Sequence, residues 1–409
     1  MQSIEIELRR ETTDAAGKRR FHPLWGRSFR PFFLGAGVYG FVVVVMWTAI
    51  WLGGLPAPAW LSPPWWHAHE MLFGLVAAAI AGFLLTAAPV WTGRPALCGR
   101  PLAVLFGIWI AGRVAMLASG ALPAALVAGI DLAFLPVVAG VLVHTLWGTG
   151  QRRNYAVAAL VGVLALANAA VHAQALGLTS ASAPRALRFT VDVVVLLIVV
   201  IGGRITPGFT TNALIRLGVN ARASSRPWLD RLAVASVALL AGLDLVVPRS
   251  HASGWLAAAA GLAVAARMAG WQTLRTLRDP LVWSLHAGMA WVVMGLFLVA
   301  AGDLNQSVPA AAGLHALTAG AMGSMILAVM TRVGLGHTGR PLILPTGALG
   351  SYLLVQTGAL ARIGAVFVSD LAHTSLLLVG GLLWAAAFGL FAILYYPILT
   401  SPRPDGKDG

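Results

Sequence analysis

Two histidines of this chain occupy the same place in a repeated motif. His69 precedes a Thr-Gly-Arg-Pro sequence at residues 92–95 by 23 residues, and His315 precedes the same sequence at residues 338–341 by the same distance. Each histidine opens an apolar stretch, and an imidazole in hydrocarbon is costly unless it binds something. Imidazole is a common ligand of haem iron and of copper. We therefore predict that His69 and His315 hold one haem b between two membrane helices.

Other histidines extend the set of candidate metal ligands. His67 and His69 are two positions apart, which separates them by about 200° around a helix, so His67 faces either Glu70 or a second metal centre. Met322 lies seven residues after His315, on nearly the same helix face, and its thioether is a soft ligand for copper. The candidate ligands for haem or copper are His67, His69, His172, His286, His315 and His337.

Glu70 is the candidate catalytic residue. It is the only glutamate after residue 11, and it stands beside the two histidines at the start of a membrane helix. An ionisable residue at such a place indicates function. Its carboxylate could orient a ligating imidazole by accepting a hydrogen bond, or it could pass protons. A third interpretation is that Glu70 caps the first turn of the helix, where negative charge is favourable.

Two arginines are expected near the cofactor. Arg113 and Arg362 each lie in the helix that follows a motif helix, in the same half of the membrane as the two histidines. Haem carries two propionates, and the planar guanidinium group matches a carboxylate. We predict that both arginines bind the haem propionates. The alternative is that they pair with acids in the membrane, and the candidates are Asp131, Asp192 and Asp303.

The composition indicates an all-α polytopic membrane protein. Of the 409 residues 58% are hydrophobic and only 10% are charged, which is unlike a water-soluble domain. The net charge of +14 is spread over short loops, so we expect a lipid bilayer around the chain and no nucleic-acid partner. About twelve helices are expected, at residues 31–52, 67–91, 101–119, 122–147, 154–178, 186–206, 228–247, 254–277, 281–302, 309–335, 343–368 and 371–396.

The loop charges predict the orientation of these helices. Lys and Arg gather before the first helix and after each even-numbered one, which places both termini in the cytoplasm. We expect a basic cytoplasmic arm at residues 1–30 with no secretion signal, one membrane domain at residues 31–396, and a cytoplasmic tail at residues 397–409. The single cysteine, Cys98, excludes a disulfide framework or an iron–sulfur cluster within one chain.

The motif is one part of a longer repeat. The first two helices resemble the ninth and tenth, because each pair follows a proline and contains one copy of the motif. A weaker third copy lies between them, where Leu187 precedes Thr210 by the same 23 residues. Three units of four helices would give twelve, and internal repeats of this kind usually place the functional site at the interface between units.

Several segments together resemble the NnrS family. They are Phe29-Arg30-Pro31-Phe32-Phe33, Trp66-His67-Ala68-His69-Glu70-Met71, Gly82-Phe83-Leu84-Leu85-Thr86, Trp91-Thr92-Gly93, Gly202-Gly203-Arg204 and residues 330–340. The resemblance implies a bacterial inner-membrane protein of about twelve helices that contains haem and copper and takes part in the response to nitric oxide.

The three-by-four arrangement also resembles the catalytic subunit of haem–copper oxidases and nitric oxide reductases, where histidines of the second and tenth helices hold a haem. His69 and His315 match that pattern. The sequence departs from it on the sixth and seventh helices, which lack a histidine-rich copper site and offer Asp192 as the most polar interior residue. An oxidase-type binuclear centre and proton pumping are therefore not expected.

Three functions follow as hypotheses. The first is a haem and copper protein that binds nitric oxide and reduces it with electrons from quinol. The second is a haem or copper carrier, or a nitric oxide sensor, without catalytic turnover. The third is a secondary transporter, which the repeats and the charges in the membrane would suit. The number of haems, the place of copper, the electron donor and the oligomeric state are left open by the sequence.

Overall fold

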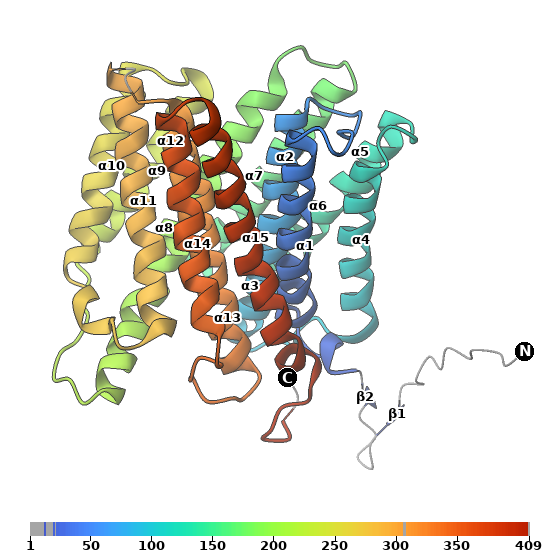
Figure 1. The fold of residues 1–409 in the computed structure, drawn as a ribbon. Coiled ribbons are helices and arrows are strands. Elements are labelled where there is room, and N and C mark those ends of the chain that lie inside the picture. Colours follow the sequence, from blue (N-terminus) through green and yellow to red (C-terminus); the bar gives the residue numbers. More distant parts are fainter. Residues whose placement is uncertain (1–11, 14–18, 21, 306–307, 408–409) are drawn as a thin grey trace, which may run out of the picture.

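The chain folds into a bundle of long helices (Figure 1). The computed structural model describes residues 12–13, 19–20, 22–305 and 308–407, so most of the basic arm predicted at residues 1–30 lies outside the described residues. Two-residue strands β1 (Thr12–Thr13) and β2 (Arg19–Arg20) pair with each other and precede a 3-10 turn, η1 (Pro23–Trp25).

The first half of the bundle contains α1 (Phe29–Trp51), α2 (Pro63–His69), η2 (Glu70–Val76), α3 (Ala77–Thr92), α4 (Gly99–Leu117), α5 (Ala124–Leu132), α6 (Phe134–Leu146), α7 (Arg152–Ala175) and α8 (Ser182–Arg216). The second half contains α9 (Pro227–Val246), α10 (His251–Ala269), η3 (Thr273–Thr276), α11 (Pro280–Asn305), α12 (Ala310–His315), η4 (Ala316–Met322), α13 (Gly323–His337), α14 (Ala348–Gly364), η5 (Ala365–Phe367) and α15 (Asp370–Thr400).

Ten helices within the described ranges are long and apolar enough to cross a membrane. This confirms a multi-pass membrane protein. The stretches expected at residues 228–247 and 343–368 are also helical, as α9 and α14. However, α9 carries three charged side chains and α14 has only 17 residues, so neither adds a span to the ten. The count of twelve spans stays a prediction.

The two motif helices share a break that the sequence did not predict. In each, an α-helix ends at the motif histidine and a seven-residue π-helix follows, η2 after His69 and η4 after His315. An α-helix then resumes, at Ala77 in one copy and Gly323 in the other. π-helical segments are rare and often mark functional sites. Their identical position supports the outer pair of repeats.

Each π-helix has a carbonyl that a tryptophan binds. The indole N–H of Trp109 donates to the carbonyl of Gly74 at 3.0 Å, and that of Trp384 donates to the carbonyl of Ala319 at 3.1 Å. A π-helix shifts the regular i→i−4 hydrogen bonding. The two tryptophans, from α4 and α15, each add a side-chain donor to one carbonyl of a π-helix.

The Thr-Gly-Arg-Pro sequence ends each motif helix. Gly93 and Gly339 both adopt the left-handed conformation, with φ of 70° and 69°, which glycine accepts without steric cost. The guanidinium of Arg94 donates to the carbonyls of His144 and Trp147 at 2.7 and 2.6 Å. These carbonyls lie at the end of α6, so the arginine ties one helix end to another.

The second copy makes the equivalent link, because Arg340 donates to the carbonyl of Ile398 in α15 at 3.5 Å. The middle copy has no such ending. Helix α8 continues through Thr210 to Arg216, and no π-helix is assigned within it. The repeated motif is therefore a structural cap in two of the three proposed units.

The start of α1 and the end of α15 meet at one end of the bundle, and α2 and α12 lie at the other (Figure 1). Arg30 connects the former pair by donating to the carbonyls of Leu399 and Ser401, both at 2.8 Å. The cytoplasmic location of that end remains an expectation from the loop charges.

Candidate functional site

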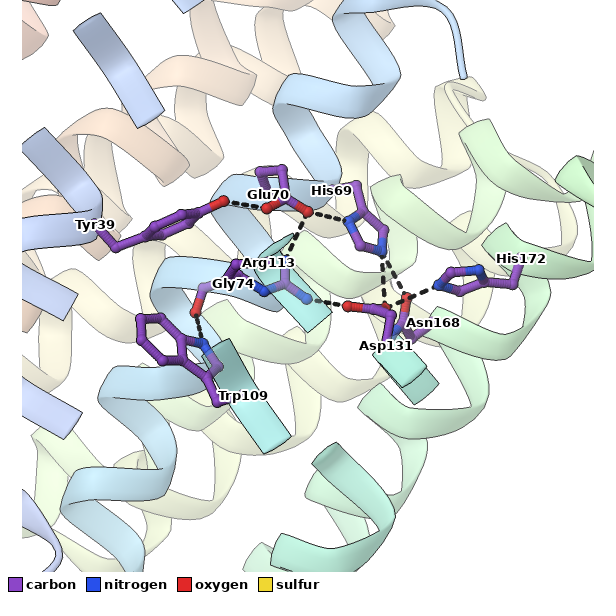
Figure 2. Close-up of polar contacts among 9 residues, drawn as sticks. All are labelled: Tyr39, His69, Glu70, Gly74, Trp109, Arg113, Asp131, Asn168 and His172. Atoms are coloured by element: carbon purple, nitrogen blue, oxygen red, sulfur yellow. Dashed lines mark hydrogen bonds and ion pairs between the residues drawn. The ribbon is translucent and has the colours of Figure 1, made fainter. Parts of the chain in front are cut away.

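A cluster of polar side chains is buried where η2 meets α4, α5 and α7. Each member is at most 8% exposed. The members of this polar cluster are His69, Glu70, Arg113, Asp131, Asn168 and His172 (Figure 2). Such groups are costly in a bundle interior unless they satisfy one another.

Glu70 anchors one side of the polar cluster. Its carboxylate accepts hydrogen bonds from the Tyr39 hydroxyl, from Arg113 Nη1 at 2.6 Å and from His69 Nδ1 at 2.9 Å (Figure 2). The bond to Nδ1 fixes the imidazole ring and leaves Nε2 on the far side, as in carboxylate–histidine–metal arrangements. The orienting role offered by the sequence matches this geometry, and proton transfer by Glu70 stays a prediction.

Asp131 anchors the other side. Its Oδ1 accepts from Arg113 Nη2, and its Oδ2 accepts from Asn168 Nδ2 and from His172 Nε2, both at 2.8 Å. Arg113 thus joins two carboxylates, Glu70 and Asp131. The sequence offered pairing with Asp131 as the alternative to a haem propionate, and Arg113 makes this pair. Its guanidinium therefore already binds two carboxylates of the protein.

The atoms around His69 Nε2 would stabilise a proton or a metal ion at this nitrogen. This atom lies 3.0 Å from Asn168 Oδ1 and 3.3 Å from Asp131 Oδ2, both of which are acceptors. Two carboxylates face one guanidinium here, which leaves one negative charge to balance. Either a second proton on the His69 ring or a metal ion would balance it.

Three side chains of the polar cluster could hold that metal. One ligand atom from each of His69, Asp131 and His172 lies within 4.8 Å of the others. Nitrogen ligands at about 2.0–2.1 Å from a tetrahedral metal lie roughly 3.3 Å apart. Here Asp131 Oδ2 lies 3.3 Å from His69 Nε2 and 2.8 Å from His172 Nε2. Trp60 covers the group, with its ring 4.3 Å from that of His172 and 5.8 Å from that of His69.

A large cavity lies beside the polar cluster. It measures about 530 Å³ and is bounded by α1, α2 and η2, α8, α12, η4 and α13, α14 and α15. This size is typical of a cofactor or ligand pocket. Its walls are mostly apolar, and the nitrogen-bearing side chains that line it are His67, His315, Arg188 and Arg362, with indole rings from Trp47, Trp51, Trp65 and Trp384.

His315 has the tautomer that a metal ligand needs. Its Nδ1 lies 2.8 Å from the carbonyl of Ala311. Because a carbonyl can only accept, Nδ1 carries a proton, and in the neutral ring Nε2 then has the lone pair that binds a metal.

His67 and Arg362 have nitrogens that lack partners. The His67 ring stacks on Trp47 with centroids 4.5 Å apart. Its Nδ1 and the Nη1 of Arg362 are buried, and neither has a hydrogen-bond partner among the described residues. Orphaned polar atoms in a cavity wall point to a missing ligand. Arg188 differs, because it pairs with Asp244 at 2.9 Å.

The structure separates the two histidines that the sequence placed on one haem. His315 lines the cavity together with His67, whereas His69 does not line it and lies in the polar cluster. The reason is the spacing noted above, because residues two positions apart on a helix point about 200° apart. Shared ligation by His69 and His315 stays a prediction, and His67 is the histidine that shares the cavity with His315.

The remaining candidate histidines lie elsewhere. His286 is buried with both ring nitrogens next to hydroxyls, those of Thr210 at 2.8 Å and Thr273 at 3.0 Å. His337 ends α13 and packs against Phe29. Within the described ranges no second group resembles the histidine and aspartate set of the polar cluster.

Sequence reasoning missed Asn168 as a member of the site and treated Asp131 only as a partner for arginine. A signal was present, because Asn168 and His172 are four residues apart and share a helix face. Which neighbour that face meets depends on how α5 and α7 pack.

This architecture defines a multi-pass membrane protein with histidine and carboxylate groups deep in its bundle. The family model described as NnrS protein matches residues 23–403, nearly the whole chain, and the chain belongs to the NnrS family. The comparison with curated proteins gave no match.

Proposed function

We propose that this protein is a haem and copper protein of the bacterial inner membrane, with both termini in the cytoplasm, that binds nitric oxide during nitrosative stress. The observation that carries the proposal is the 530 Å³ cavity, where His315 presents an unprotonated nitrogen beside the unpartnered nitrogens of His67 and Arg362. Membership of the NnrS family supports it.

The cavity suits haem b by its chemistry. A haem has a broad apolar face, a metal that takes imidazole ligands and two carboxylates, and the cavity offers apolar walls, two imidazoles and a free guanidinium nitrogen. In this proposal His315 is an iron ligand and Arg362 binds a propionate. His67 is either the second iron ligand or a residue beside the iron's vacant coordination site.

The repeat supports this role of Arg362. Residues 246 positions apart correspond in the two outer copies, so Ala316 stands where the first copy has Glu70 and Leu377 stands where it has Asp131. Arg362 lies 249 positions after Arg113, three more than this spacing, and by that longer spacing Gly380 stands where the first copy has Asp131. By either spacing the second copy lacks both carboxylates that bind Arg113. The Nη1 atom of Arg362 is buried and has no partner among the described residues, which is costly for a charged group and favours an anionic ligand.

Copper is proposed to bind at His69, Asp131 and His172. Imidazole and carboxylate are suitable ligands for Cu(II), and the hydrogen bond from His69 to Glu70 holds that ring ready. When bound, haem iron supplies a coordination site for nitric oxide, and copper and haem supply electron transfer. The chain itself places Trp60 against the rings of His69 and His172 and keeps Glu70 fixed through Tyr39 and Arg113.

In one form of this proposal the protein catalyses the reduction of nitric oxide. Two molecules of nitric oxide would take up two electrons and two protons and give nitrous oxide and water, with a membrane quinol as the source of electrons. Glu70 is the carboxylate proposed to pass protons. The second form is binding without turnover, as a carrier or sensor, and the three hydrogen bonds that hold the Glu70 carboxylate in place favour it.

The test is the cofactor content of the full chain, purified in detergent from a host that makes haem. The expected result is stoichiometric haem b and copper, with haem lost on His315→Ala and retained in the exposed control His251→Ala. A wild-type protein that folds and takes up neither cofactor would contradict the proposal and would leave the secondary-transporter hypothesis.

A further inference from the structure

A second, smaller cavity lies at the meeting point of α3, α8 and α13. Its volume is about 90 Å³, and its exposed lining is almost wholly apolar. We name it the central pore. Helices in a protein pack closely against one another, so an unfilled space of this size between three helices needs an explanation.

Corresponding residues of three helices line the central pore. One set is Val76, Val194 and Met322, and another is Ile80, Ile198 and Ile326. Within each set the first two members are 118 residues apart and the last two are 128 apart.

The same two spacings relate His69, Leu187 and His315. The alignment of the weak middle copy with the two outer copies therefore places together the same residues that line the central pore. The central pore lies where the three copies face one another.

The central pore adjoins the large cavity. Val76, Met322 and Ile326 line both spaces. Val76 and Met322 are also the last residues of η2 and η4, so the π-helices end where the two spaces meet. These three apolar side chains therefore border both the central pore and the cavity that His315 lines.

The chemistry of the lining restricts the occupant. Water and ions need polar partners, and dry apolar cavities bind small apolar molecules such as xenon. A haem is too large for about 90 Å³, whereas a diatomic gas fits. We infer that the central pore is a binding site for a small uncharged gas, which it stores and delivers to the large cavity. Nitric oxide is that gas if the proposed function holds, and the inference rests on it to that extent.

The first arm of the test is independent of haem. Crystals of the full chain are pressurised with xenon, which we expect to occupy the central pore. In Ala79→Phe the added ring projects from a buried position in its wall, and the xenon should be lost. Wild-type crystals without xenon at this place would overturn the inference, whatever the haem content.

The second arm measures the rate at which nitric oxide rebinds after flash photolysis. Ala79→Phe should rebind severalfold more slowly with an unchanged haem spectrum, while Leu166→Phe, 72% exposed on α7, should match wild type. Val329→Phe, in the wall formed by α13, replaces Ala79→Phe if that variant fails to fold. Wild-type rates in a folded pore variant that has lost xenon would overturn delivery through the central pore. A wild-type protein without haem would refute the proposed function and leave the xenon result standing.

Discussion

His67 and His315 line one cavity although 248 positions separate them in the chain, while His69, two residues from His67, lies in the polar cluster. Replacing His315 or His67 by alanine should lower haem content severalfold, because each removes a nitrogen from the cavity wall. His69→Ala should retain haem. Haem per chain, measured by pyridine haemochrome, decides this. Haem loss in His69→Ala together with normal haem in His67→Ala would instead favour the pair predicted from the sequence.

Arg362→Gln should weaken haem binding while the protein stays folded. A charge-assisted hydrogen bond contributes about 1.5–3 kcal/mol, which corresponds to roughly a tenfold or greater loss of affinity. Arg362→Lys keeps the charge and should lose less. Haem titration of the apoprotein measures both. Equal affinities for wild type and Arg362→Gln would exclude a contact with a propionate.

His172→Gln should remove copper and keep haem, because His172 belongs to the polar cluster and does not line the large cavity. Elemental analysis and copper EPR of the purified variant measure the change. His286→Gln is the matched control, since its ring nitrogens contact threonine hydroxyls. Wild-type copper in His172→Gln would show that copper binds somewhere else.

Glu70→Gln should retain haem and lose quinol-driven consumption of nitric oxide in liposomes. The substitution keeps the size of the side chain but removes the negative charge that faces Arg113 and His69. Equal rates in wild type and variant would exclude Glu70 from the reaction. No consumption by a wild type that holds both cofactors would favour the carrier or sensor.

Gly93→Ala should destabilise the protein by about 1–2 kcal/mol, because alanine pays that cost in a left-handed conformation. The site is open, with nothing within 4 Å of an added Cβ, so backbone strain alone acts. Gly339→Ala should cost at least as much, since its Cβ would approach Arg403 and Asp405 at 3.1 Å. Thermal unfolding in detergent compares the two. An unchanged midpoint for both would contradict the capping role of the motif.

The sequence predicted well those features that depend on spacing along the chain. The family, the multi-pass architecture and the equivalence of His69 and His315 follow from motifs and apolar runs, and the matched π-helices agree with that equivalence. The π-helices themselves have no marker in the sequence, because Glu70 and Ala316 begin them with unrelated side chains.

Contacts between helices could not be predicted in the same way. Whether His67 or His69 faces His315 depends on the rotation and tilt of α2, which packing decides. The polar cluster joins four separate segments, and only the four-residue spacing of Asn168 and His172 was visible beforehand.

The most direct measurement is the optical spectrum of the purified, reduced wild-type protein before and after nitric oxide is added. We predict the bands of a b-type haem and a shift of these bands on addition of nitric oxide, with both features lost in His315→Ala. A folded wild-type protein whose spectrum lacks haem, or whose haem bands do not respond to nitric oxide, would contradict a nitric oxide-binding haem in the large cavity.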